Sequence, residues 1–186
     1  MAITEIKFCG RGGQGAVMAS QMLGLAFLKG GFYPQCYSVF GGERRGAPVY
    51  SYLRVDREKI LLKCNIKNPN QLICLDESLF EPDNPAWLPT AGGLILINTR
   101  RSVEAWEGFH GFTVGCLDAG EIGKRTGLGR VINTTILGAY CRIHESLKLD
   151  DLLDAVTEMA PAKTDANLEA VRLAYDAVKI IPLREE

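Results

Sequence analysis

The sequence predicts an α/β fold: a single three-layer sandwich with a mixed, mostly parallel sheet and a helical C-terminal third. Three observations predict it. Short apolar segments alternate with a helical pattern in the first two thirds of the chain, as in strands that are joined by helices. One segment has a two-faced alternation followed by a polar turn, which indicates an antiparallel element. The last third has helical periodicity. We therefore expect residues 1–186 to form one domain.

The composition is that of a folded protein without a broad electrostatic field. Hydrophobic residues make up 47% of the 186 residues, charged residues make up 23%, and the net charge is −1. A chain with this charge is not expected to recruit nucleic acid or an anionic membrane. No apolar segment approaches the ~20 residues that span a bilayer, and the N-terminus lacks the pattern of a secretion signal. We expect a cytoplasmic protein with neither nucleic acid nor membrane as a partner.

The first half of the chain predicts three strands and one helix. Each strand is a short segment bounded by glycine or polar residues. These strands are residues 3–9, 32–39 and 47–55. Between the first two, apolar periodicity predicts a helix over residues 16–29. Gly30 and Gly31 end it, because glycine can adopt the left-handed cap geometry.

The predicted strand at residues 47–55 carries the evidence for an antiparallel element. Its alternation indicates two different faces. The polar turn at residues 56–59 and the apolar run at residues 60–62 then predict a hairpin. Because a hairpin pairs its strands antiparallel, we expect a mixed sheet.

The rest of the chain predicts further strands and then helices. Residues 72–75 and 94–97 are wholly apolar, as expected for parallel strands that are covered on both faces. A further strand is predicted at residues 112–117. Three prolines between the two apolar strands confine any helix there to short pieces. The helical patterns that follow cover residues 131–145, 149–159 and 167–179.

Cysteine and histidine spacing gives no local signature of a metal site. No two of the six cysteines lie within five positions of each other, which excludes C-x-x-C zinc spacing and clustered iron–sulfur runs. We expect all six to be buried thiols. His144 could act as a base, but no serine or cysteine nucleophile pattern accompanies it. The sequence therefore predicts no catalytic residue and no metal ligand. The cysteines are Cys9, Cys36, Cys64, Cys74, Cys116 and Cys141.

A glycine-rich loop between the first strand and the first helix is the main candidate binding site. The order strand, G-x-G-x-x-G and helix directs backbone N–H groups toward a phosphate. The helix N-terminus adds partial positive charge, and Arg11 would add a mobile cation. The alternative is a tight turn whose glycines only let the helix pack on the sheet. The loop consists of Gly10, Arg11, Gly12, Gly13, Gln14 and Gly15.

Two familiar nucleotide sites are disfavoured. A dinucleotide site expects an acidic residue ~20 positions after the loop, at the end of the second strand. Residues 35–40 contain no acid, so NAD(P) binding is disfavoured. The loop also lacks the Gly-Lys-Ser/Thr ending of a P-loop.

Arg44 and Arg45 form the second candidate binding site, on a loop rich in glycine. Two guanidinium groups on such a loop suit a carboxylate, a phosphate or an acidic partner surface. The alternative is a solvated loop in which Glu43 pairs locally.

Four segments together resemble the gamma subunits of pyruvate and other 2-oxoacid:ferredoxin oxidoreductases. They fall in the order of that family and cover nearly the whole chain. Cys9 is a departure, since the family more often has a small residue such as glycine there. The segments are FCGRGGQG at residues 8–15, GERRGAPVY at 42–50, NTTILGA at 133–139 and NLEA at 167–170.

The resemblance implies one subunit of a complex that oxidatively decarboxylates a 2-oxoacid, usually to acyl-CoA, CO2 and reduced ferredoxin or another acceptor. Thiamine diphosphate, Mg2+ and [4Fe-4S] clusters would lie on partner chains of alpha, beta and delta type. Coenzyme A would be the co-substrate, and this chain alone would bind no cofactor and be inactive. In the complex, the glycine loop and the Arg44–Arg45 loop would be where it contacts a cofactor. The alternative is a free-standing nucleotide- or CoA-binding α/β module, supported only by the glycine loop.

Overall fold

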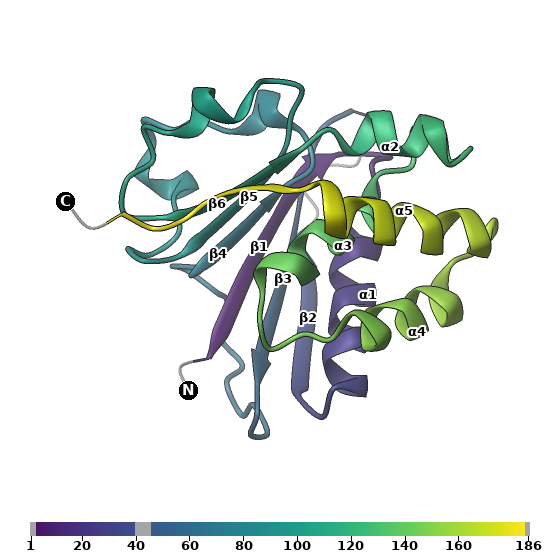
Figure 1. Cartoon of the computed structure of the whole chain (residues 1–186). Coiled ribbons are helices and arrows are strands. Elements are labelled where there is room, and N and C mark those ends of the chain that lie inside the picture. Colours follow the sequence, from purple (N-terminus) through teal and green to yellow (C-terminus); the bar gives the residue numbers. More distant parts are fainter. Residues whose placement is uncertain (1–2, 40–45, 185–186) are drawn as a thin grey trace.

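A seven-stranded mixed sheet crosses the molecule in the order β2-β3-β1-β4-β5-β6-β7 (Figure 1). The structure is a computed structural model and describes residues 3–39 and 46–184. Strands β1, β2, β4, β5 and β6 run in one direction, and β3 and β7 run in the other. The predicted mixed, mostly parallel sheet is therefore confirmed. The strands are β1 (Thr4–Arg11), β2 (Tyr33–Val39), β3 (Pro48–Asp56), β4 (Gln71–Cys74), β5 (Leu94–Asn98), β6 (Thr113–Leu117) and β7 (Lys179–Ile181).

The antiparallel element differs from the predicted hairpin. Residues 60–62 form no strand, so the hairpin prediction is wrong. Strand β3 instead pairs antiparallel with β1 on one side and with β2 on the other. Because both edges of β3 are occupied, no edge is left for residues 60–62. The sheet is mixed as predicted. Its antiparallel pairs, however, join β3 to β1 and β2, which are farther from β3 in the sequence than residues 60–62 are.

Helices cover one face of the sheet, and short 3-10 helices cover the other (Figure 1). The predicted bounds of α1 and α4 are confirmed. The last predicted helix ends earlier, at Ala177, because the residues after it pair with β6 as strand β7. None of the helices in the described residues is long and apolar enough to cross a membrane. The α-helices are α1 (Ala16–Lys29), α2 (Ala119–Arg125), α3 (Asn133–Ile143), α4 (Leu149–Met159) and α5 (Thr164–Ala177).

The second face of the sheet has a separate apolar cluster. The 3-10 helices there are η1 (Glu77–Leu79), η2 (Pro85–Trp87) and η3 (Val103–Trp106). Their side chains Leu79, Trp87 and Trp106 are buried with strand residues such as Ile95 and Ile97. The prolines thus limit helix in the first part of this layer to short pieces, as predicted. The third layer consists of these turns and the segments that join them.

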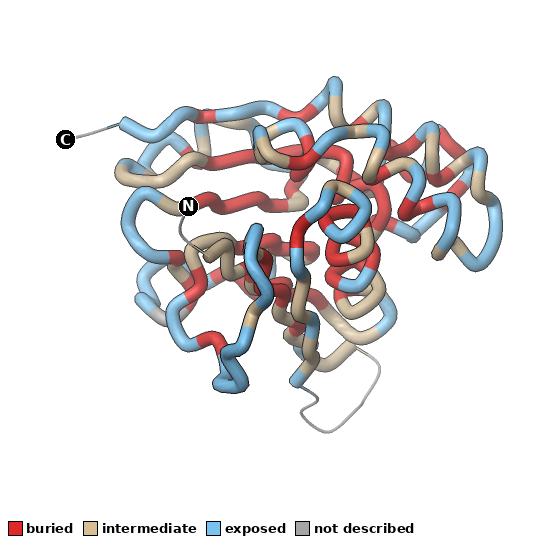
Figure 2. The backbone as a smooth tube through the Cα atoms, turned by 90° about the horizontal axis from the view of Figure 1, so that it is seen from below, coloured by how far each residue is buried: buried red, intermediate tan, exposed pale blue. Residues whose placement is uncertain are grey.

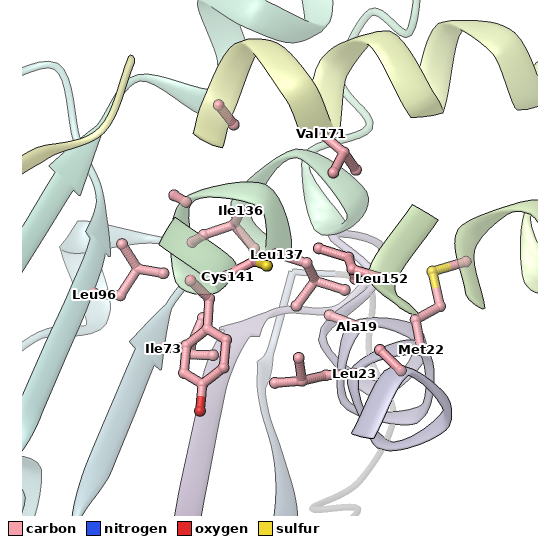
Figure 3. Packing of buried hydrophobic residues seen from close by; sticks show 14 of the residues in the cluster. Ala19, Met22, Leu23, Ile73, Leu96, Ile136, Leu137, Cys141, Leu152 and Val171 are labelled. Atoms are coloured by element: carbon pink, nitrogen blue, oxygen red, sulfur yellow. The ribbon is translucent and has the colours of Figure 1, made fainter. Parts of the chain in front are cut away.

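Helix α3 lies at the centre of the helical layer, between the sheet and α5 (Figure 3). Every residue from Thr134 to Cys141 is buried, and buried backbone runs through the sheet and the helices packed on it (Figure 2). Gly138 allows the closest approach to α5. A Cβ atom on Gly138 would lie 2.1 Å from the carbonyl oxygen of Val171. The two helices can therefore keep this spacing only with glycine at position 138.

We predict that Gly138→Ala lowers the free energy of unfolding by about 3 kcal/mol, because the added methyl group must push two helix backbones apart. Urea denaturation followed by circular dichroism measures this. The control is Gly120→Ala in α2, where a Cβ atom would meet only Asp118 Oδ1, at 3.2 Å. This control should change stability by less than about 1 kcal/mol. Wild-type stability in Gly138→Ala would contradict the close approach of α3 and α5.

Candidate functional site

The glycine loop lies at the carboxyl edge of the sheet, where four neighbouring parallel strands end. It follows β1, and β4, β5 and β6 end beside it in that order. Polar residues follow each of these three strands, among them Asp76, Thr99 and Asp118. Ligands of open α/β sheets bind at this edge. The fold therefore brings the predicted loop together with polar residues that are distant in the sequence.

Two glycines of the loop are required by backbone geometry. Gly13 and Gly15 have φ angles of 96° and 82°, a region that residues with a Cβ atom rarely adopt. Gly15 is also crowded, since a Cβ atom there would lie 2.9 Å from Nδ2 of Asn133 at the start of α3. The turn into α1 is thus tight, and its glycines have an architectural role whether or not the loop binds a ligand.

Arg11 is held in place, so the prediction that it is a mobile cation is wrong. Its Nε atom lies 3.2 Å from Oδ2 of Asp76. Its other guanidinium nitrogens donate to Ser78 Oγ at 2.8 Å and to the carbonyl oxygen of Gly46 at 3.2 Å. The reason is strand order: β4 pairs with β1, Cys74 opposite Cys9, so the residues that follow β4 emerge beside Arg11. Its side chain is 38% exposed.

Asp76 organises the loop, and sequence reasoning missed it. Its Oδ2 atom accepts from Gln14 Nε2 at 2.9 Å, and its Oδ1 atom accepts from the backbone N–H and the hydroxyl of Ser78 at 3.1 and 2.6 Å. Burial acts to raise the pKa of Asp76, but the hydrogen bonds from Ser78 and Gln14 and the charge of Arg11 outweigh it and lower the pKa. The available signal was its position directly after the wholly apolar segment at residues 72–75.

Gln14 closes the loop on itself. Its Oε1 atom accepts from the backbone N–H of Arg11 at 2.7 Å, while its own backbone N–H donates to the carbonyl oxygen of Arg11 at 3.0 Å. With the bond from Gln14 Nε2 to Asp76, this side chain links the loop to the segment that follows β4. The predicted site residues Gly10 to Gly15 thus form one hydrogen-bonded unit with Asp76.

Unused backbone donors point to what the loop can bind. Among the described residues, no acceptor is found for the backbone N–H groups of Gly13 and Gly15, or for those of Ala16 and Val17 in the first turn of α1. The N-cap residue Gly15 offers no side-chain cap. Such donors, together with the partial positive charge of the helix N-terminus, favour an anion.

Two hollows flank the loop. One, of about 440 Å³, lies between the loop and the starts of α3 and α5, and is lined mostly by apolar side chains such as Met18, Met22 and Leu128. The other, of about 280 Å³, is polar and is lined by Gln14, Asp76 and residues that follow β5 and β6. The loop therefore separates an apolar surface from a polar one, an arrangement that suits a ligand with both kinds of group.

Arg44 and Arg45 lie outside the described residues. The segment that follows them does contact the glycine loop, since the backbone N–H of Gly12 donates to the carbonyl oxygen of Ala47 at 2.9 Å. With the bond from Arg11 to Gly46, this places the start of the β3 segment against the loop.

Topology adds an argument against a dinucleotide site. In dinucleotide-binding folds, the strand that follows the first helix lies parallel and next to the first strand. Here β3 lies between β1 and β2. No acidic residue that could bind a ribose stands at the expected position in the sequence. The strand that would carry it, β2, also does not lie next to β1.

Two buried cysteines, Cys9 and Cys74, lie opposite each other on β1 and β4, next to the loop. In the described part of the chain, no group of three or more His, Cys, Asp or Glu residues could hold a metal ion. Cys36 and Cys64 are exposed, so the prediction of six buried thiols is wrong for these two. Cys36 lies on the edge strand β2, where its Sγ atom still contacts the carbonyl oxygen of Ser20 in α1 at 3.3 Å, and Cys64 lies on the loop after β3. His144 caps the end of α3 that is opposite to the glycine loop.

Known proteins match this chain over nearly its whole length. Residues 5–177 match the family model described as pyruvate ferredoxin/flavodoxin oxidoreductase. The chain is 36% identical to the pyruvate synthase subunit PorC of Methanothermobacter marburgensis, over 94% of this chain and 97% of that protein. It is 35% identical to the gamma subunit of the NADH-dependent phenylglyoxylate dehydrogenase of Aromatoleum evansii, over 95% and 94%. The crystal structure of the pyruvate oxidoreductase subunit PORC of Thermotoga maritima has a TM-score of 0.83 and 31% identity, over 97% and 99%.

We predict that Asp76→Asn lowers the free energy of unfolding by about 1–2 kcal/mol at neutral pH, because it weakens charge-assisted hydrogen bonds to Arg11 and Gln14. The folded-state pKa of Asp76 lies below its ordinary value of 3.8, so its contribution is complete above that pH and is lost as the pH falls through the lowered pKa. The difference between variant and wild type should therefore shrink below about pH 4. Denaturation at several pH values measures it, with the exposed Asp83→Asn as control. A difference that grows toward low pH would contradict the assignment.

Proposed function

Because this chain belongs to the pyruvate ferredoxin/flavodoxin oxidoreductase family, as a gamma-type subunit, we propose that it works within a multi-subunit complex that oxidises a 2-oxoacid with thiamine diphosphate. The observation that carries this is the match over residues 5–177, together with relatives of nearly equal length that are themselves subunits of such oxidoreductases. The resemblance found in the sequence is thereby confirmed at the level of the family.

In the proposed complex, a 2-oxoacid is oxidatively decarboxylated to CO2 and, with coenzyme A, to an acyl-CoA, while ferredoxin or another acceptor takes up the electrons. We assign thiamine diphosphate, Mg2+ and the [4Fe-4S] clusters to partner chains of alpha, beta and delta type. We further propose that residues 1–186 act as one gamma-type domain in the cytoplasm.

The substrate class that we propose is the 2-oxoacid as such. The relatives named above act within a pyruvate synthase and a phenylglyoxylate dehydrogenase, whose substrates share the 2-oxoacid group and differ in the side chain. Gamma-type chains of similar sequence thus serve substrates of different size. This favours a role for this chain that is independent of the substrate side chain.

For the glycine loop, we propose contact with an anionic group, either a phosphate of coenzyme A or the edge of thiamine diphosphate. The backbone donors of Gly13, Gly15 and the first turn of α1 would carry most of the contact. The Arg11 guanidinium is partly neutralised by Asp76 and adds a positioned cation rather than a mobile one. Arg44 and Arg45 are proposed to contribute to the same contact.

A free-standing nucleotide- or CoA-binding module remains the second candidate function. Its support is the glycine loop with its unused donors and the apolar hollow beside it. A module of this kind would purify alone and bind its ligand without partners. A subunit would purify with larger chains that carry iron–sulfur clusters.

Expressed alone, the chain should fold but show no 2-oxoacid oxidoreductase activity and contain no iron. Expressed with its partners, it should co-purify with larger chains in a brown complex. Iron analysis, visible absorption and an oxidoreductase assay check both statements. Stoichiometric iron in the isolated, folded chain would contradict the assignment of the clusters to other subunits. Purification of the chain by itself from cells that contain the partners would favour the free-standing module.

Arg11→Ala should raise the KM for coenzyme A of the intact complex by roughly tenfold, the lower end of what a charged hydrogen bond contributes. Yield of the complex should stay near wild type, because losing the bonds of the partly exposed Arg11 should cost about as much as Asp76→Asn, which is less than the stability of a typical domain. The matched control is Lys29→Ala, since Lys29 lies at the other end of α1 and also pairs with a carboxylate, that of Glu158. Its KM should be unchanged.

Gly15→Val tests the architectural role of the loop separately. It should reduce the yield of intact complex, because the new side chain meets Asn133 and the left-handed backbone is strained. An unchanged KM for coenzyme A in Arg11→Ala, with loss of folding in Gly15→Val, would leave the loop as a turn without a ligand contact.

A further inference from the structure

Residues 57–68, here called the basic loop, concentrate positive charge at the end of the molecule opposite to the glycine loop. The loop follows β3, which runs antiparallel to β1, and therefore leaves the sheet at the other edge (Figure 1). It contains Arg57, Lys59, Lys63 and Lys67 with one acid, Glu58, so its net charge is +3. The whole chain has a net charge of −1, which leaves −4 for the remaining residues.

Side chains of the sheet hold the basic loop in one conformation. Arg54, which is only 1% exposed, pairs with Glu5 and donates to the carbonyl oxygen of Cys64 at 3.2 Å. Gln35 donates to the carbonyl oxygen of Leu62 at 3.0 Å, and the hydroxyl of Tyr37 accepts from the backbone N–H of Ile66. Contacts with β2 and β3 thus position a loop that has no regular secondary structure.

The outer side of the basic loop exposes apolar side chains. Leu61 is 78% exposed and Leu62 is 44% exposed. Tyr33, which is 49% exposed, starts β2 and shares a sheet face with Gln35 and Tyr37, the residues that contact the loop. Apart from Ile60 and the buried Ile66, the loop is exposed throughout (Figure 2). An ordered loop therefore presents leucines to solvent among lysines.

The lysines of the basic loop are not neutralised within the described residues. The ion pairs found there engage Arg11, Lys29, Arg54, Arg100 and Lys124. None engages a lysine of the basic loop. Arg57 instead lies over the ring of Phe32, 4.4 Å from its centroid. The positive charge is therefore available to an acidic partner.

We propose that the basic loop is a docking surface for another protein chain of the same oxidoreductase complex, one that presents an acidic surface around an apolar hollow for Leu61. This rests on the proposed function. Apolar residues at the centre with charged residues around them are the usual anatomy of a protein interface. Lysines at such a rim speed association and make it dependent on salt. The net charge of −4 on the rest of the chain opposes an extended polyanion such as nucleic acid or an anionic membrane.

The test uses the tagged chain co-expressed with the other subunits, and measures how much of them it retains at increasing salt. The triple variant Lys59→Glu, Lys63→Glu, Lys67→Glu should bind the rest of the complex roughly tenfold more weakly at about 0.15 M salt, and its binding should no longer depend on salt. Leu61→Asp should also weaken binding about tenfold, through a faster dissociation rate. Circular dichroism should show the fold of both variants unchanged, because all four positions are exposed.

The matched control reverses three exposed arginines elsewhere: Arg125→Glu, Arg130→Glu, Arg172→Glu. It changes the charge by the same amount and should leave association unchanged. Equal binding by the basic-loop triple and the control would overturn the proposal. An intact complex that loses only binding to duplex DNA or to phosphatidylserine vesicles would overturn it in favour of a polyanion. If the wild-type chain retains no other subunit, the proposed function is wrong. If the wild-type chain retains the other subunits and the variants retain them equally well, only the proposed docking surface is wrong.

Discussion

The close packing of α3 against α5 is the constraint on which the rest of the structure depends. Gly138 lets the two helix backbones approach, and α3 is then buried along its length between α5, the sheet and its neighbouring helices. The same seating places Asn133, the first residue of α3, against Gly15. The position at which α3 begins sets the space that is left for the backbone of the glycine loop. The packing of the helical layer therefore constrains the loop. The packing of the core therefore sets the geometry of the candidate site.

Strand order decides the electrostatics of the candidate site. Because β4 lies beside β1, Asp76 emerges next to Arg11 and binds it together with Gln14. The loop is consequently preorganised, and part of its cationic charge is already neutralised. Donors that remain unused are backbone N–H groups at the start of α1, whose direction is fixed by the helix. Such a loop suits recognition of an anion by geometry more than by long-range attraction.

The two ends of the sheet carry different kinds of surface, as expected for a subunit that acts by contacting other molecules. At the carboxyl edge, polar groups gather around a glycine loop and two hollows. At the amino edge, buried Arg54 holds a loop whose leucines and lysines point outward. Arg54 itself is a polar residue in the alternation of β3, and its burial is made possible by Glu5, Gln35 and the carbonyl oxygen of Cys64. The strands β1 and β3 connect both surfaces.

The sequence by itself determined most of the strands and helices, the glycine loop and the family. The predicted bounds of α1 and α4 hold because amphipathic periodicity, glycine and proline act within a few residues. Only the tertiary structure decided the pairing of β3 with both β1 and β2, the strand β7 after α5, the fixed position of Arg11 and the exposure of Cys36 and Cys64. Arg11 and Asp76 are separated by 65 positions, so no local pattern relates them. They meet because the order of strands in a sheet is set by which apolar faces can be buried together, a property of the whole chain.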